Sequence, residues 1–244
     1  MRKHVSEITS QHVTLSVADG TSMNAYVATP AKRSGFAPGI IVFQEAFGVN
    51  AHIKDVTERF ARLGFVAVAP ELFHRTAEPG FEGSYTDFES VRPHFGALGL
   101  DGLLADIDAA YGFLTECADV DDERIAAAGF CLGGRMTYLA NARVKLRAGI
   151  SFYGGGIAPD LLDRAAQQHA PLLMFWGGLD AHIPAEQYRA VADALTAAGK
   201  VHEQVVFGQA DHGFFCDQRA SYNAIAARQA WALALEFLRA YEVF

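Results

Sequence analysis

The sequence has few cysteines and no long hydrophobic run. Its three cysteines, Cys117, Cys131 and Cys216, are spread over 244 residues and form no CxxC pair. An odd count without such a pair excludes a disulfide framework and a zinc knuckle, so we expect reduced thiols and a cytoplasmic protein. Arg2 and Lys3 resemble the start of a signal peptide, but no apolar stretch follows them. No window approaches the roughly eighteen apolar residues that a membrane span requires, so we expect none.

The sequence also has fewer basic than acidic residues. The chain carries 20 Lys and Arg against 28 Asp and Glu, a net charge of −8. Nucleic acid and anionic membranes would be repelled on average, which argues against both as partners. Internal repeats, low-complexity tracts and long charge runs are absent as well. With 51% hydrophobic residues, the composition predicts one domain, 1–244, with a full core.

The apolar pattern predicts an α/β fold. Segments 12–17 and 23–29 alternate apolar and polar residues around the turn "ADGTS", which indicates an antiparallel hairpin at a sheet edge. After them, short apolar runs alternate with helical patterns, which is typical of βαβ units and a mostly parallel sheet with helices on both faces. The expected strands are 39–45, 65–70, 124–130, 147–153, 171–177 and 202–207, and the expected helices are 53–63, 103–114, 133–142, 160–168, 184–198 and 221–241.

One long segment interrupts this alternation. Residues 74–99 are rich in glycine, polar and aromatic residues and have only weak periodicity. A stretch of this length between a strand and a helix is unusual unless it forms a lid or a binding loop. A plain surface excursion is the alternative, and the sequence does not decide between the two.

The pattern G-x-C-x-G around Cys131 indicates a nucleophile elbow. In such an elbow a strand turns sharply into a helix, and the residues two places before and after the apex must be small, as Gly129 and Gly133 are. The apex thiol would project at the carboxyl edge of the sheet, next to a helix N-terminus that favours a thiolate. On this motif alone, a buried structural cysteine is equally compatible.

The partners that a nucleophile needs favour the catalytic interpretation. Asp180 follows one predicted strand and His212 follows the next, in the chain order nucleophile, acid, histidine. His182 is a competing histidine, but it lies on the acid loop itself. Asp211 is a competing acid, but its side chain is adjacent in sequence to the base, so we expect it to support the start of the next helix.

Three separated stretches give the chain a resemblance to a known family. These are "VFQEAFGVN" at 42–50, "GFCLGGRM" at 129–136, and the loops carrying Asp180 and His212. The chain resembles the dienelactone hydrolases (carboxymethylenebutenolidases), which are small α/β-hydrolases with a Cys-His-Asp triad. The resemblance extends from Gly39 to the C-terminus. It implies a hydrolase that acts on a small lactone or ester and needs no metal or organic cofactor.

The resemblance also implies roles for further residues. Glu45 would accept the proton of Cys131; the alternative is a structural ion pair with Arg75 or Arg135. The backbone N–H groups of Leu132 and Ala46 would form the oxyanion hole.

Arg75 matches one family arginine that holds a substrate carboxylate, although without the resemblance a surface arginine would be the better interpretation. The second family arginine is replaced by Cys216, and the nearest arginine is Arg219. This replacement weakens the prediction of dienelactone itself as the substrate.

Other functions stay open at this point. A different small ester or an uncharged lactone would suit the same chemistry, in a monomer or a small homo-oligomer. A non-catalytic binder would leave Cys131 inert to alkylation. A redox-sensing thiol protein would oxidise Cys131 reversibly, with Cys216 as the one conceivable resolving partner. Cys216 is otherwise expected to be a packed small residue, and Cys117 a core or helix-end residue.

Overall fold

A computed structural model of the chain describes residues 7–32 and 35–244. Arg2 and Lys3, which resemble the start of a signal peptide, lie outside the described residues. The elements in chain order are β1 (Ile8–Ser16), β2 (Ser22–Pro30), β3 (Ala37–Phe43), α1 (Ala51–Arg62), β4 (Val66–Pro70), α2 (Arg92–Gly96), α3 (Leu100–Glu116), β5 (Val120–Phe130), α4 (Leu132–Arg143), β6 (Ala148–Phe152), the 3-10 helix η1 (Leu162–Gln167), β7 (Leu172–Gly177), α5 (Ala185–Ala197), β8 (His202–Phe207) and α6 (Ala224–Ala240).

All of these strands join one eight-stranded sheet, in the order β1-β2-β4-β3-β5-β6-β7-β8. β1 pairs antiparallel with β2, and β2 pairs antiparallel with β4, whereas every pairing from β4 to β8 is parallel. The predicted α/β fold with an antiparallel hairpin at the sheet edge is therefore confirmed. The parallel strands β3, β4, β6 and β7 are wholly buried because helices cover both faces, whereas the edge strand β8 is partly exposed.

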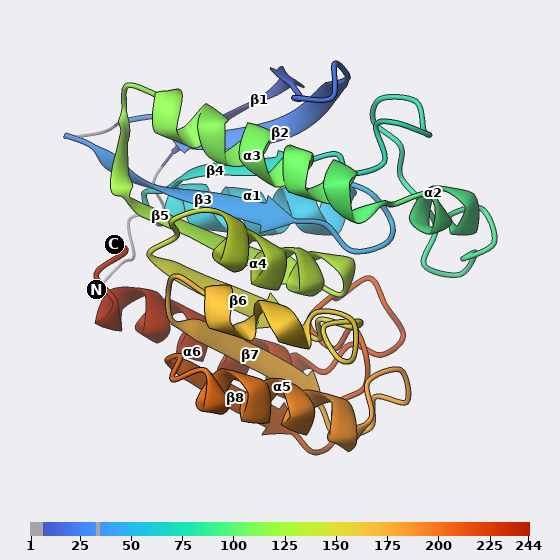
Figure 1. Ribbon diagram of the computed structural model, residues 1–244. Coiled ribbons are helices and arrows are strands. Elements are labelled where there is room, and N and C mark those ends of the chain that lie inside the picture. Colours follow the sequence, from blue (N-terminus) through green and yellow to red (C-terminus); the bar gives the residue numbers. More distant parts are fainter. Residues whose placement is uncertain (1–6, 33–34) are drawn as a thin grey trace.

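The helices divide between the two faces of the sheet. α3, α4 and α5 cover the face toward the viewer in Figure 1, and α1 and α6 cover the other. The segment around α2 projects beyond the carboxyl ends of the parallel strands (Figure 1). At this edge the βα loops converge, and open α/β sheets form their sites there.

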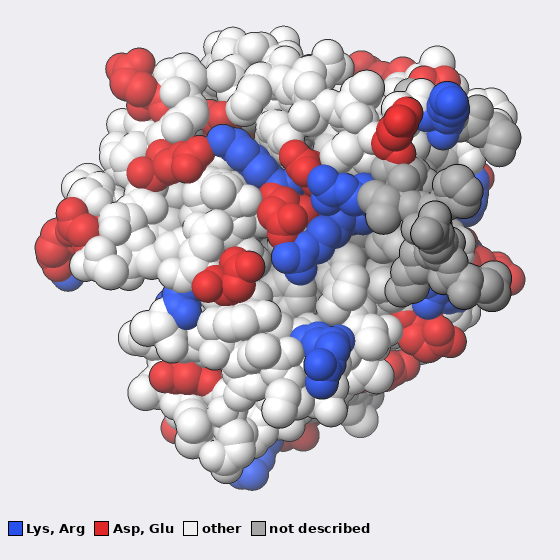
Figure 2. Space-filling view, turned by 180° about the vertical axis from the view of Figure 1, so that it is seen from behind, with Lys and Arg blue, Asp and Glu red and all other residues white. Residues whose placement is uncertain are grey.

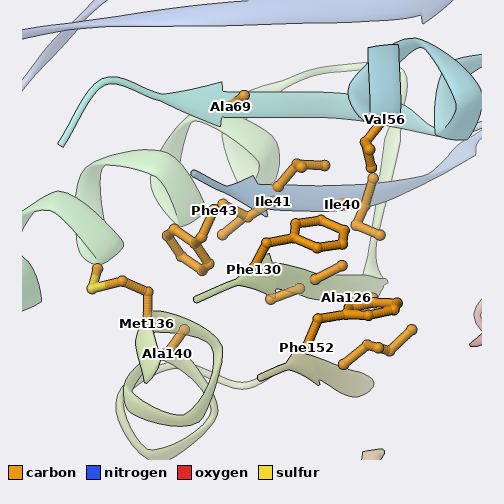
Figure 3. Close-up of a cluster of buried hydrophobic side chains, with 14 of the residues drawn as sticks. Ile40, Ile41, Phe43, Val56, Ala69, Ala126, Phe130, Met136, Ala140 and Phe152 are labelled. Carbon is orange, nitrogen blue, oxygen red and sulfur yellow. The ribbon is translucent and has the colours of Figure 1, made fainter. Parts of the chain in front are cut away.

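Aromatic side chains fill the centre of the core. Phe130 at the end of β5 stacks on Phe152 of β6 with 4.6 Å between the ring centroids, and Phe215 stacks on Phe130 at 5.2 Å. Aliphatic side chains of β3 and α1 pack beside these rings (Figure 3). The end of β5, which precedes Cys131, is therefore held by rings from neighbouring strands and from the loop after His212.

Two predicted segments differ from the structure. The helix expected over 160–168 is the shorter 3-10 helix η1, which ends where the Gln168 side chain bonds to the carbonyls of Tyr138 and Arg164. Within 74–99 a five-residue helix, α2, forms. It has no buried residue, so no apolar stripe was there to predict it.

The surface carries charges of both signs. On the face opposite to the view of Figure 1, blue and red side chains intermingle in a central cluster and are otherwise scattered (Figure 2). Over the described ranges, no helix combines the length and apolar character needed to cross a membrane.

Candidate active site

The elbow at Cys131 is built by close backbone contacts. An added Cβ at Gly129 would lie 1.9 Å from the carbonyl oxygen of Gly133, and one at Gly133 would lie 2.2 Å from that of Phe43. A Cβ at Gly134 would lie 2.7 Å from both the Phe152 oxygen and the Gly154 Cα. Three glycines therefore let α4 start directly against the ends of β3, β5 and β6.

Cys131 itself has an unusual backbone conformation. Its φ is 54° and its ψ is −112°, a combination that non-glycine residues rarely adopt. Its amide donates to the carbonyl of Phe152 over 3.0 Å, while the carbonyl of Cys131 accepts from the N–H of Gly134 in the first turn of α4. A strained apex held by its neighbours is what a nucleophile elbow requires.

Asp180 and His212 meet as the sequence predicts. Asp180 Oδ2 lies 2.7 Å from His212 Nδ1, and both residues are buried. The other oxygen of Asp180 accepts from the backbone N–H groups of His182 and Ile183, at 2.8 and 3.1 Å. The carboxylate is thus fixed from both sides and orients the imidazole with its Nε2 free for Cys131.

The two competing residues take other positions. The ring of His182 stands edge-on to that of His212, with 5.4 Å between the centroids, and faces the same cavity. Asp211 accepts from the backbone N–H of His212 over 2.6 Å. The expectation that Asp211 supports the next helix is wrong, because α6 begins at Ala224 and is capped by the Asn223 side chain.

His212 is electrostatically tuned by its neighbours. Burial by itself lowers the pKa of His212, but negative charge on Cys131 and hydrogen bonds to Asp180 and Cys131 outweigh it and raise this pKa to about 10. For Asp180, burial opposes ionisation, yet the hydrogen bonds from His212 and from two backbone N–H groups lower its pKa. The imidazole therefore stays protonated at neutral pH when Cys131 is charged.

Cys131 and His212 open into a cavity of about 530 Å³. That volume is in the range of sites for small molecules. Leu132 and Ala46, the two residues expected to form the oxyanion hole, line the same cavity. Part of its wall is aromatic, and the segment 74–99 supplies Tyr85, Phe88 and Phe95 to that part. This segment is therefore a wall of the cavity and no plain surface excursion.

Glu45 is fully buried at the end of β3 and has two partners. Its Oε1 accepts from Arg219 Nη1 over 3.0 Å, and its Oε2 accepts from the Tyr85 hydroxyl over 2.9 Å. The ion pair thus forms with Arg219, and with neither Arg75 nor Arg135. The Arg219 guanidinium also lies over the rings of Phe47 and Tyr85, at 5.8 and 5.6 Å from their centroids.

Arg75 does not lie in this cavity. Its guanidinium forms two hydrogen bonds to the buried carboxylate of Asp106, at 2.8 and 2.9 Å, and one to Asp19 at 2.8 Å. Asp106 also bonds to His74 Nε2 over 3.0 Å. Arg75 therefore ties the end of β4 to α3 and to the β1–β2 turn. The structure does not bring it together with the other expected site residues.

Two other arginines face the cavity instead. Arg219 is one, and Arg135, one helical turn after Cys131 on α4, is the other. Arg135 Nε is buried without a hydrogen-bond partner among the described residues, and its Nη1 lies 3.9 Å from the half-exposed Asp160. The sequence carried a signal for both: Arg135 stands inside the elbow motif, and Arg219 is the first arginine after His212. Tyr85 had no signal beyond its place in 74–99.

Comparisons with known proteins agree with this geometry. The model of the dienelactone hydrolase family matches residues 23–242. A protein of Synechocystis sp., named as a candidate carboxymethylenebutenolidase, is 40% identical over 215 residues, covering 84% of this chain and 87% of its own length.

Solved structures give the same result. The crystal structure of a candidate dienelactone hydrolase from Klebsiella pneumoniae superposes with a TM-score of 0.87 at 33% identity, over 96% of this chain and 99% of that one. A dienelactone hydrolase-like promiscuous phosphotriesterase from metagenomic libraries superposes with a TM-score of 0.84 at 26% identity, over 96% and 98% of the two chains.

Proposed function

The chain belongs to the dienelactone hydrolase family and is an ester or lactone hydrolase, and from this premise we propose that it acts through a Cys131–His212–Asp180 triad and an acyl-enzyme. One observation carries the proposal. A cysteine on a strained elbow and a histidine bonded over 2.7 Å to a buried aspartate open into one cavity. A non-catalytic binder has no need of such a constellation.

The reaction starts at the thiol. Glu45 accepts the proton of Cys131, and the resulting thiolate lies beside the His212 imidazolium. The thiolate attacks the ester carbonyl, and the backbone N–H groups of Leu132 and Ala46 stabilise the oxyanion. As the C–O bond breaks, His212 donates its proton to the leaving oxygen, which leaves an acyl group on Cys131.

Water then completes the turnover. Neutral His212 takes a proton from a water molecule, whose oxygen attacks the thioester carbonyl and releases the acid. His212 is an imidazolium again, Cys131 returns as a thiolate, and the proton on Glu45 goes back to it when product leaves. Asp180 holds the imidazole in the orientation that both transfers need.

Glu45 needs to be released from its partners before it can act. In the resting arrangement both carboxylate oxygens accept hydrogen bonds, from Arg219 and from Tyr85. A substrate anion that binds Arg219 competes with Glu45 for the same guanidinium. Substrate binding would therefore free the carboxylate to approach Cys131.

The cavity lining indicates the substrate class. Phe47, Tyr85, Phe88 and Phe95 offer flat apolar faces, and Arg135 offers a guanidinium with an unpartnered Nε. This combination suits a small unsaturated lactone that carries a carboxylate. An uncharged ester is the second candidate, favoured by the commitment of Arg219 to Glu45 and by Cys216 at the family's second arginine position.

Steady-state hydrolysis of cis- and trans-dienelactone, together with a neutral aryl ester, tests the proposal. We expect turnover by the wild type and none by Cys131→Ala, and intact-mass analysis of a rapidly quenched reaction should find the acyl group on Cys131. Turnover that survives in Cys131→Ala would contradict the triad. Cleavage of the neutral ester alone would select the second candidate.

A further inference from the structure

Three potential metal ligands are buried together behind the substrate cavity. Glu45 follows β3, His52 is in the first turn of α1, and Cys216 lies in the loop after His212. Each residue offers one ligand atom: a carboxylate oxygen of Glu45, a ring nitrogen of His52 and the sulfur of Cys216. These three atoms all lie within 4.8 Å of one another. Each side chain is buried, with 2% exposure or less.

The histidine of this group has an unmet hydrogen-bonding capacity. His52 Nε2 is buried and has no hydrogen-bond partner in the described part of the chain. Its ring packs edge-on against Phe130 and Phe215, so the ring is held in place. A neutral imidazole has a nitrogen lone pair that is available to a Lewis acid.

We propose that Glu45, His52 and Cys216 form a binding site for a divalent transition metal ion such as Zn²⁺. A thiolate, an imidazole and a carboxylate are the donor set that Zn²⁺ prefers, and three protein ligands leave a fourth position for water or for Tyr85 oxygen. Zinc binds such ligands at about 2.0–2.3 Å, so side-chain movements of roughly 1 Å would close the site.

Metal binding requires one proton to leave and no change of oxidation state. The Cys216 S–H bond breaks, the proton goes to solvent and the sulfur–metal bond forms. In the absence of metal the Cys216 thiol donates to the Tyr85 hydroxyl over 3.3 Å, and that hydroxyl donates to Glu45 Oε2. The ion would take the place of the thiol proton on Cys216. The Tyr85 hydroxyl would keep its proton and turn it away from Glu45 Oε2, while Arg219 stays on Glu45 Oε1.

The site is reached from the substrate cavity. Tyr85 and Arg219, which contact Cys216 and Glu45, both line that cavity. An ion bound behind them holds Glu45 away from Cys131, so occupancy inhibits hydrolysis. This consequence rests on the proposed function, whereas metal binding itself does not.

Cobalt binding to the Cys131→Ala variant tests the site without the catalytic thiol. Under anaerobic conditions, Co²⁺ should produce a thiolate-to-metal charge-transfer band at a stoichiometry of one ion per chain. The band should vanish in Cys131→Ala/Cys216→Ser and persist in Cys131→Ala/Cys117→Ser, the matched control. Because failure of hydrolysis leaves this band unaffected, the two proposals can be judged separately.

His52→Phe provides a second variant that preserves the aromatic packing. In the Cys131→Ala background it should weaken Co²⁺ binding by roughly 10-fold or more, since even an outer partner of a ligand contributes 10–100-fold. Zn²⁺ should raise the Tm of Cys131→Ala but not that of Cys131→Ala/His52→Phe. No band with Cys131→Ala at millimolar Co²⁺, or an unchanged band after loss of Cys216, would overturn the proposal.

Discussion

Once Glu45 has taken the proton of Cys131, the imidazole of His212 lies between the negative charges of Cys131 and Asp180, and its protonation should govern the pH dependence of hydrolysis. With a pKa of about 10, it keeps its proton through neutral pH and can protonate the leaving group. We expect kcat to fall as the pH rises through about 10, because kcat reports the enzyme–substrate complex in which the thiolate is formed.

Asp180→Asn should change both the rate and this pH profile. Removing the carboxylate takes away a hydrogen bond and a charge that raise the pKa of His212, so the alkaline loss of activity should move to lower pH. Loss of the correct ring tautomer should lower kcat by roughly 10⁴-fold. A pH–rate series for the wild type and the variant measures both effects, and an unmoved alkaline limb would contradict the assigned role.

Arg135 should distinguish charged from neutral substrates. Arg135→Gln should raise the KM for an anionic lactone by roughly 10-fold, because a charge-assisted hydrogen bond contributes about 1.5–3 kcal/mol. The KM for a neutral ester should stay unchanged. Arg75→Gln is the matched control, since Arg75 bonds to Asp106 away from the cavity; an equal effect of both substitutions on KM would argue against Arg135 as the anion ligand.

Individual roles were predictable only where a motif fixed them. Chain order and strand ends were enough to bring Asp180 and His212 together, because parallel strands end at one edge. The prediction that Arg75 binds substrate was wrong, because its guanidinium forms an ion pair with Asp106, a buried carboxylate on α3. The sequence offers no periodic signal for such a pairing across 31 residues.

At the scale of elements, the turn from β5 into α4 depends on the absence of side chains. Gly129→Ala would put a Cβ 1.9 Å from the Gly133 oxygen and 2.8 Å from Thr137 Oγ1. We expect the free energy of unfolding to fall by about 3 kcal/mol or more, because backbone cannot move aside there. Urea unfolding measures the change.

Gly112→Ala supplies the control for that experiment. Gly112 lies inside α3, where an added Cβ meets nothing within 4 Å. The substitution should raise stability by roughly 0.5–1 kcal/mol, since alanine loses less conformational entropy in a helix. If Gly129→Ala and Gly112→Ala lowered the free energy of unfolding by similar amounts, the elbow would not be specially crowded.

Elements were predictable in proportion to their burial. The buried parallel strands β3, β4, β6 and β7 were visible as apolar runs, since helices cover both faces. The short exposed helix α2 and the 3-10 geometry of η1 were not, because they depend on side-chain bonds and loop packing. The segment 74–99 was recognisable as an anomaly, and its contribution to the cavity wall became clear only from its position in the fold.

For the whole molecule, the ring cluster at the centre of the sheet should dominate stability. Phe152 is 1% exposed and packs against Phe130, Phe175 and Phe215. Phe152→Ala should lower the free energy of unfolding by about 3–5 kcal/mol. Phe36→Ala, at a side chain that is 68% exposed, should change it little.

The same unfolding curves test the prediction of a single domain over 1–244. One sheet and one core should give coincident transitions by far-UV circular dichroism and by tryptophan fluorescence. Two separated transitions would contradict a single cooperative unit.

The strained backbone of Cys131 affects the stability of the whole protein. A φ of 54° costs a cysteine roughly 1–3 kcal/mol that a glycine would not lose. The backbone conformation at this position thus favours glycine over cysteine. In the proposed triad, activity and stability are therefore opposed at this position, because a glycine would relieve the backbone strain and remove the nucleophile.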